Sequence, residues 1–208
     1  RYANTHGVTD FSGEEIESDN ILDKWIMARL HQFERDVQLA TEDYQVDKAA
    51  RYFIPFIDDL SNWYVRRSRD RFQRPANDKE KQEAFGTLNS VLVRSAKTMA
   101  PYMPFVTEMI YRNLVDDKAS VHLEYQSDVI ELSDEEKKIV ENMAEAREIV
   151  SEGLGLRAIN AMKVRQPLAK IVVQGTKIDD DLVEMALDEV NVKQIEFVKE
   201  LPDWGNGV

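Results

Sequence analysis

Hydrophobic residues in the first 115 positions recur at steps of three and four, which is the spacing of one face of an α-helix. This spacing predicts helices at about residues 20–40, 46–71, 79–99 and 104–114. In the last of these, Phe105, Met109 and Ile110 are expected to face inward. Because short links join the predicted helices, we expect an antiparallel helical bundle.

The predicted helix at 46–71 changes character along its length. The apolar face of its first half consists of Phe53, Ile57, Leu60 and Tyr64. The next two positions on that face are Arg67 and Arg71, and residues 63–74 carry five arginines against one acid. Pro55 should kink the apolar half, because proline removes a backbone donor. We therefore expect one end of this helix in a core and the other beside an anion.

Two interpretations of the cationic end stay open on the residues alone. It could be a solvated helix terminus, stabilised by the helix dipole and by pairs with Asp58 and Asp59. It could also contact phosphates or bases, since each guanidinium offers a planar fork of donors. The aromatic residues Trp63, Tyr64 and Phe72 could then stack on an unpaired base. The nearby acids are too few to neutralise all five arginines.

The pattern changes in the last third of the chain. Ser133 and Glu136 form a capping-box pattern, which predicts a fifth helix from there to about residue 160. Residues 171–173 and 191–198 are predicted strands, with a short helix at 179–189 between them. We therefore expect a mainly α protein, an antiparallel helical bundle followed by a small α/β appendage. The expected domains are a connecting segment at 1–18, the bundle at 19–160, and a small α/β domain and tail at 161–208.

Composition narrows the possible functions. The chain has 208 residues and no cysteine, which excludes a disulfide scaffold and a thiolate zinc site. Its three histidines, His6, His31 and His122, lack metal-ligand spacing, so we expect no metal. No stretch has the length and hydrophobicity of a membrane span.

The charge is strongly negative but unevenly placed. A net charge of −12 argues against a general nucleic-acid binder. However, residues 116–152 carry a net charge of −8 whereas residues 63–74 carry +4. A locally basic face on an acidic protein can still bind nucleic acid, because the acidic faces repel wrong approaches.

The stretch FIDDLSNWYVRRSRDRF at residues 56–72 resembles the helix that opens the anticodon-binding bundle of the isoleucyl-tRNA synthetases, a family of class I synthetases. The related valyl enzymes have a similar helix but a different run after the Trp-Tyr pair. KVRQPL at residues 163–168 is typical of the small domain that follows the bundle in the isoleucyl family. RYAN at residues 1–4 resembles the stretch after the catalytic domain, and the resemblance as a whole covers nearly the entire chain.

The resemblance implies that the chain is the C-terminal anticodon-binding region of such an enzyme. It would recognise the anticodon stem-loop of tRNA(Ile), while a catalytic domain of the same polypeptide uses ATP and Mg to activate isoleucine and attaches it to the tRNA. The two catalytic signatures of class I synthetases, His-x-Gly-His and Lys-Met-Ser-Lys-Ser, are missing from the chain. We therefore expect no catalysis and no cofactor in this chain itself, and a cytoplasmic monomer without a membrane partner.

The candidate tRNA contacts follow from the cationic stretch and from KVRQPL. Trp63 is expected to stack on a base, unless it is a buried residue of the bundle. Contacts to phosphates and bases are expected from Arg66, Arg67, Arg69 and Arg71, with Arg74, Arg94 and Lys97 as further candidates. A second contact is expected at Lys163, Arg165 and Gln166, unless these residues form a solvated turn.

Two alternative functions stay open. The chain could be the anticodon-binding domain of a related class I synthetase (valyl, leucyl or methionyl), which only the identity of the bound tRNA would separate. It could also be a helical-bundle module for protein interaction, whose arginines meet an acidic partner. Dependence on the anticodon separates that module from a tRNA binder.

Overall fold

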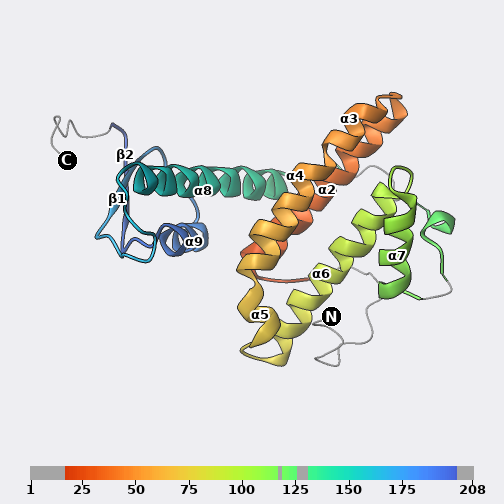
Figure 1. The fold of residues 1–208 in the computed structure, drawn as a ribbon, viewed down its shortest axis with the longest axis horizontal. Coiled ribbons are helices and arrows are strands. Elements are labelled where there is room, and N and C mark those ends of the chain that lie inside the picture. The colour runs from red at the N-terminus through yellow and green to blue at the C-terminus, as the bar shows by residue number, and fades with distance from the viewer. Residues whose placement is uncertain (1–16, 117–118, 126–130, 201–208) are drawn as a thin grey trace. The chain divides into compact units, whose positions relative to one another are not determined.

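The structure, a computed structural model, describes residues 17–116, 119–125 and 131–200. Most of the predicted connecting segment, with His6, lies outside the described residues, and so do residues 201–208 at the end of the predicted small domain and tail. The chain divides into two compact units, residues 1–137 (the first unit) and 138–208 (the second unit). Figure 1 shows that helices dominate the fold, as the sequence predicts.

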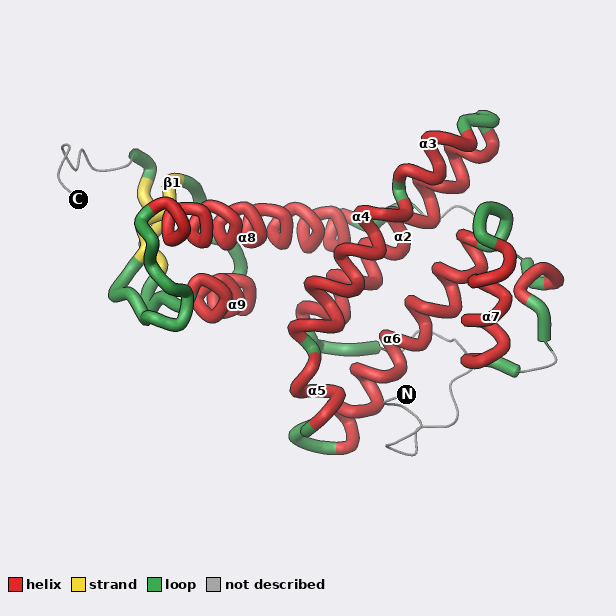
Figure 2. Tube along the Cα trace, in the orientation of Figure 1, coloured by secondary structure: helices red, strands yellow, loops and turns green. Residues whose placement is uncertain are grey.

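The first unit is a set of helices connected by short turns (Figure 2). Its elements are α2 (Ile21–Glu42), α3 (Val46–Arg51), α4 (Phe53–Asp58), the π-helix η1 (Asp59–Val65), α5 (Arg69–Gln73), α6 (Asp78–Met99), α7 (Pro104–Leu114) and the 3₁₀-helix η2 (Val121–Leu123). Helix α2 packs along α6, and α6 packs along α7. Asn20 caps the start of helix α2, and its side-chain oxygen accepts a hydrogen bond of 3.0 Å from the backbone N–H of Leu22.

The predicted single helix at 46–71 is wrong, because four elements occupy this stretch. The first break is at Tyr52, which ends α3 and precedes α4. Pro55 therefore lies in the first turn of α4, where backbone donors have no intrahelical acceptor and proline costs little. The π-helix η1 follows, and a turn at Ser68 precedes α5.

Aromatic rings fill the core between α2 and α4. The Phe33 ring stacks on Phe56, with ring centroids 4.3 Å apart, and meets Phe53 edge-on at 5.8 Å. Such pairs contribute about 0.5–1.5 kcal/mol each beyond the area they bury. Phe56 is 1% exposed whereas Ile57, predicted on the apolar face, is 40% exposed. The breaks in the helix rotate Phe56 inward in place of Ile57.

Helix α7 has the predicted bounds but a different buried face. Phe105 and Met109, expected inward, are 91% and 58% exposed. The buried residues are Thr107 and Tyr111, of which Tyr111 joins a small cluster with Val93, Ala100 and Val121. The apolar residues of α7 form two stripes, and contact with α6 and η2 buries the one that contains Tyr111.

The second unit combines a long helix with a small parallel sheet. Its elements are the remainder of α8 (Asp134–Ile159), then β1 (Ile171–Gln174), α9 (Asp180–Val190) and β2 (Ile195–Val198). The two strands pair in parallel, with Ile171 opposite Ile195, and α9 is the crossover that parallel pairing requires. The sequence predicts this α/β arrangement.

Helix α8 begins with the predicted capping box. The Ser133 N–H donates to Glu136 Oε2 at 2.8 Å, and the Glu136 N–H donates to Ser133 Oγ at 3.2 Å. From residue 138 onward α8 belongs to the second unit, where Gly153 lets it approach α9 closely. A Cβ at Gly153 would lie 2.9 Å from the Val190 side chain. The contacts therefore divide the chain within α8. The domain boundary after residue 160 stays a prediction.

Candidate nucleic-acid interface

The π-helix η1 turns acidic and aromatic side chains toward α2. Its wider turns bring residues five apart toward one side, and both Asp59 and Tyr64 are buried. Arg29 of α2 donates from Nε to Asp59 Oδ2 at 2.8 Å. Trp63 is half-buried, and it precedes Tyr64 in the same element. The Tyr64 hydroxyl donates to Asp23 of α2, so the η1 segment is fixed to α2 near both of its ends.

Asp23 of α2 is the centre of a buried hydrogen-bond network. It is 1% exposed. Arg71 of α5 donates to both of its carboxylate oxygens, with 2.7 Å for each bond. The Tyr64 hydroxyl donates to Oδ1 at 2.8 Å, and the Ser18 hydroxyl donates to Oδ2 at 2.6 Å. The network joins α2, η1 and α5 through one carboxylate.

The electrostatics of this network fix its protonation. Burial raises the pKa of the Tyr64 phenol well above its usual range, and the neighbouring charge of Asp23 raises it further. Tyr64 therefore remains a hydrogen-bond donor. Burial alone would lower the pKa of the Arg71 guanidinium, but the hydrogen bonds and the charge of Asp23 raise it overall. Arg71 therefore remains a cation that faces a buried anion.

The other arginines of residues 63–74 (the arginine end) lie nearer the solvent. Arg67 is half-buried, whereas Arg66, Arg69 and Arg74 are exposed. Arg66 donates from Nε to the carbonyl of Asn62 at 2.9 Å. In the part of the chain that the structure describes, neither Arg69 nor Arg74 forms an ion pair.

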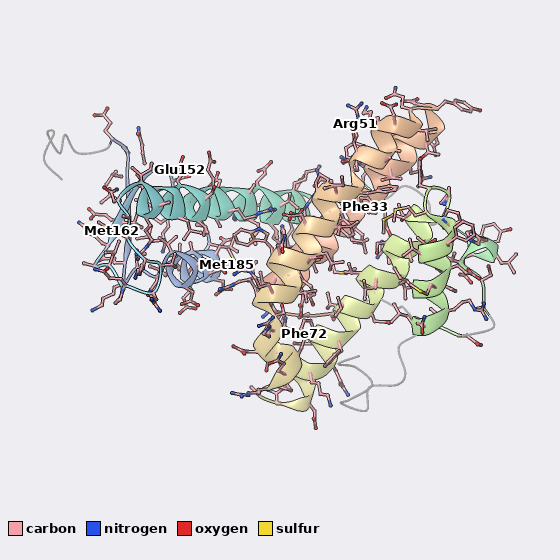
Figure 3. All side chains as sticks on the ribbon, in the orientation of Figure 1. Phe33, Arg51, Phe72, Glu152, Met162 and Met185 are labelled. Atoms are coloured by element: carbon pink, nitrogen blue, oxygen red, sulfur yellow. The ribbon has the colours of Figure 1, made fainter. Side chains whose placement is uncertain are left out.

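The turn after α5 is held by the start of α6. The Asn77 side chain accepts from the Glu80 N–H at 2.8 Å, and Glu80 Oε2 accepts from the Ala76 N–H at 2.6 Å. Phe72 anchors α5 itself, with its ring 5.2 Å from Phe85 of α6, and Figure 3 labels Phe72 on this short helix. Arg69 thus stands on a helix with an aromatic anchor, and Arg74 directly follows that helix, before the fixed turn.

The two candidate cations on α6 are occupied by acids. Arg94 donates to both carboxylate oxygens of Glu34 on α2, at 3.0 and 2.6 Å. Lys97 Nζ lies 2.8 Å from Glu124 Oε2 and 5.7 Å from the centre of the Tyr111 ring. Both cations join elements of the first unit.

The remaining candidates lie in the second unit. Lys163, Arg165 and Gln166 are exposed, and they form a turn in which the Gln166 N–H donates to the Lys163 carbonyl at 2.9 Å. Arg157, which the sequence did not single out, is 3% exposed and donates to the Lys163 carbonyl at 3.1 Å. It also donates to the Asn191 carbonyl at 2.8 Å, so it supports this turn from beneath.

Comparison with known proteins identifies the kind of domain. The family model described as the anticodon-binding domain of tRNA ligase matches residues 23–173. The chain belongs to this family. Among its relatives is an isoleucine–tRNA ligase of Chlamydia abortus, 36% identical over 98% of this chain and 20% of the relative. The isoleucine–tRNA ligase of Clostridium acetobutylicum is 38% identical over 93% of this chain and 19% of the relative. Isoleucine–tRNA ligase 2 of Bacillus cereus is 39% identical over 83% of this chain and 17% of the relative.

The match places both the arginine end and the Lys163 turn inside the anticodon-binding family region. The chain spans about a fifth of the length of the relatives it matches. Within the described ranges, no three His, Cys, Asp or Glu side chains are grouped so as to hold a metal ion. No helix in those ranges is long and apolar enough to cross a membrane.

Sequence reasoning missed Asp23, which organises this anticodon-binding domain. The clue was available in the periodicity, because Arg71 continues the apolar face that ends at Tyr64. A cation on a buried stripe requires a buried acid opposite. The acid itself could not be chosen from the sequence, since it stands on α2, 48 residues away.

Proposed function

We propose that this domain binds the anticodon stem-loop of tRNA(Ile) through the arginine end, as part of an isoleucine–tRNA ligase. The observation that carries the proposal is the exposure of Arg66, Arg69 and Arg74 on one short segment of a chain whose net charge is −12. Family membership supports anticodon binding, and the names of the relatives support isoleucine as the amino acid. An RNA backbone supplies the anions that these exposed cations would face.

Guanidinium groups suit this role chemically. Arg66, Arg69 and Arg74 would contact phosphates, because each offers paired N–H donors and a permanent charge. Trp63, half-buried on η1, would stack on a base that is splayed out of the loop. We leave Arg71, Arg94 and Lys97 out of the proposed contact, because acids of the first unit occupy them.

The reaction itself would belong to the rest of the longer polypeptide. ATP, Mg and isoleucine would bind to its catalytic domain in the cytoplasm. Binding energy gained at the anticodon would position the acceptor end of the tRNA at that distant site. A wrong anticodon would leave polar groups at the interface unpaired and so weaken binding.

A binding assay tests the proposal. The chain is titrated with tRNA(Ile), with a tRNA(Ile) carrying a changed anticodon, and with valine tRNA, each at several salt concentrations. We expect preference for the isoleucine anticodon and a linear fall of log affinity with log salt. The double variant Arg66→Ala/Arg69→Ala should bind more weakly and reduce the salt slope by about 0.7 per lost phosphate contact.

The matched control removes the same charge elsewhere. Lys48 and Arg51 are exposed on α3, and Figure 3 labels Arg51 at the end of the first unit away from Phe72. The double variant Lys48→Ala/Arg51→Ala should bind tRNA as the unchanged chain does. Equal loss in both variants would mean a general charge effect, and equal affinity for all three tRNAs would contradict anticodon recognition.

The assay also separates the two alternatives. Preference for valine tRNA would assign the domain to a related class I synthetase. Absence of tRNA binding at low salt would favour a module for protein interaction, in which the arginine end meets an acidic protein.

A further inference from the structure

We propose that Asp23, Tyr64 and Arg71 form a positioning device that orients the arginine end for tRNA. Arg71 acts through Asp23 and does not touch the RNA. This inference rests on the proposed function, and it assigns one of the five arginines a different task from its neighbours. Its basis is the geometry of the network and the weakness of the element that bears the arginines.

Helix α5, which carries Arg69 and Arg71, is too short to hold its own orientation. Helix α5 has only five residues, Arg69–Gln73, and its backbone departs from helical geometry at Ser68 and Arg74. An isolated helix this short is unstable in water, so its orientation depends on tertiary contacts. Those contacts are the buried ring of Phe72 and the guanidinium of Arg71.

The guanidinium of Arg71 is committed to the protein. Two of its nitrogens donate to Asp23, and its Nε lies 3.7 Å from Glu80 Oε1. Its side chain is only 11% exposed. A phosphate could bind Arg71 only by displacing Asp23, which would leave a carboxylate buried without its cation. Arg69 and Arg74, two and three residues away, are exposed and carry no such cost.

Asp23 couples α5 to both of its neighbours. Tyr64 donates to the same Oδ1 that accepts from Arg71, so the end of η1 and the middle of α5 share one acceptor. This shared acceptor holds both ends of the backbone segment that carries Arg66 and Arg69, which lie between Tyr64 and Arg71 in the chain. Prior orientation strengthens binding because fewer side chains and less backbone must be ordered when the RNA arrives.

The experiment compares Asp23→Asn, Arg71→Gln and the double variant with Arg69→Ala. Affinity for tRNA(Ile) is measured across salt concentrations, at a temperature where circular dichroism shows every variant folded. We expect each single network variant to lose about tenfold in affinity, and the double variant to lose no more than either single one. The salt slope should stay unchanged in all three, whereas Arg69→Ala should lower it by about 0.7.

Hydrogen exchange supplies a readout that needs no tRNA. The amides of α5 should lose protection in Asp23→Asn while those of α2 and α6 keep it. Arg71→Lys, which keeps the charge, should recover part of the affinity. If Asp23→Asn does not fold, Tyr64→Phe removes the hydrogen bond to the same oxygen, together with the longer one to the Ala84 carbonyl at 3.3 Å, and should give a smaller loss of the same kind.

The outcomes separate the possible failures. A lower salt slope in Arg71→Gln with normal affinity in Asp23→Asn would mean that Arg71 contacts the RNA. Lower melting temperatures with unchanged affinity would mean that the network only stabilises the fold. Either result overturns the inference and leaves the proposed function standing. An unchanged chain that binds no tRNA(Ile) would overturn the proposed function and the positioning role together.

Discussion

Two neighbouring parts of the first unit carry cations with different surroundings. On α6, Arg94 faces Glu34 and Lys97 faces Glu124. At the arginine end, Arg69 and Arg74 are exposed and form no ion pair within the described residues. Both parts carry basic side chains, so the difference lies in whether another element presents an acid. A surface is suited to bind an anion of another molecule where its cations outnumber the acids of the protein around them, and the presence of arginine alone is not enough.

Arg71 lies among the exposed arginines, but like Arg94 and Lys97 it is paired with an acid of another element. It is paired with Asp23, which is more deeply buried than either acid facing α6. A sequence stretch with five arginines thus contains two populations, one directed inward and one directed outward. Replacing an inward arginine should therefore change the stability of the fold more than replacing an outward one.

Replacing Arg71 should affect stability far more than replacing Arg69. Arg71→Ala leaves the Asp23 carboxylate buried without a cation and should lower the free energy of unfolding by about 3–5 kcal/mol. Arg69→Ala, on the exposed side of the same helix, should change it by no more than about 0.5 kcal/mol. Urea denaturation followed by circular dichroism measures both. Similar losses in the two variants would contradict the division into inward and outward arginines.

The sequence predicts much of the fold because the signals it carries are local. The bounds of α2, α6 and α7, the capping box of α8 and the α/β order of the second unit depend on neighbouring residues. The breaks around η1 cannot be predicted from neighbouring residues, since no residue in that stretch specifies a π-helix. The inward turn of Asp59 and Tyr64 is stabilised by Arg29 and Asp23 on α2, which periodicity within one helix cannot show.

The candidate site shows the same limit. The cationic stretch was visible in the sequence, but the separation of Arg71 from Arg66, Arg69 and Arg74 depends on acids distant in the chain. Arg94 is another example, because its partner Glu34 lies 60 residues away. Which of the arginines contact tRNA stays a prediction.

Trp63 should matter for binding more than a fully exposed aromatic residue does. If a base stacks on its ring, Trp63→Ala should weaken tRNA(Ile) binding by about 1–3 kcal/mol. Phe105, which is 91% exposed on α7, is the matched control, and Phe105→Ala should leave affinity unchanged. Fluorescence titration of both variants measures the difference. Equal affinities in Trp63→Ala and the unchanged chain would remove Trp63 from the interface.

The Arg94–Glu34 pair should stabilise the fold modestly and leave tRNA binding alone. Each of the two side chains is 17% exposed, and the contact uses both carboxylate oxygens. A double-mutant cycle with Arg94→Ala and Glu34→Ala should give a coupling of about 1 kcal/mol in unfolding free energy. The affinity of Arg94→Ala for tRNA(Ile) should equal that of the unchanged chain. A loss of affinity would add α6 to the proposed interface.

The smallest expected effect concerns two neighbouring acids at the start of α8, one engaged and one exposed. Glu136 lies 2.5 Å from His31 Nδ1 and accepts from Ser133, whereas Glu135 is exposed. Burial alone would raise the pKa of Glu136, but the hydrogen bonds from His31 and Ser133 lower it overall. Because the pKa is lower in the folded state, Glu136 stabilises the fold above its unfolded pKa of about 4.3. That contribution disappears as pH falls through the lower folded value.

Melting temperatures between pH 6 and pH 3 test this sign. The unchanged chain and Glu135→Gln should lose stability together as the pH falls below about 4.3. Glu136→Gln can keep the capping box through its amide oxygen but cannot titrate. It should therefore start less stable at pH 6 and lose less on acidification. Parallel curves of melting temperature against pH for Glu136→Gln and Glu135→Gln would contradict this prediction. They would mean that the hydrogen bonds to Glu136 do not favour its charged form.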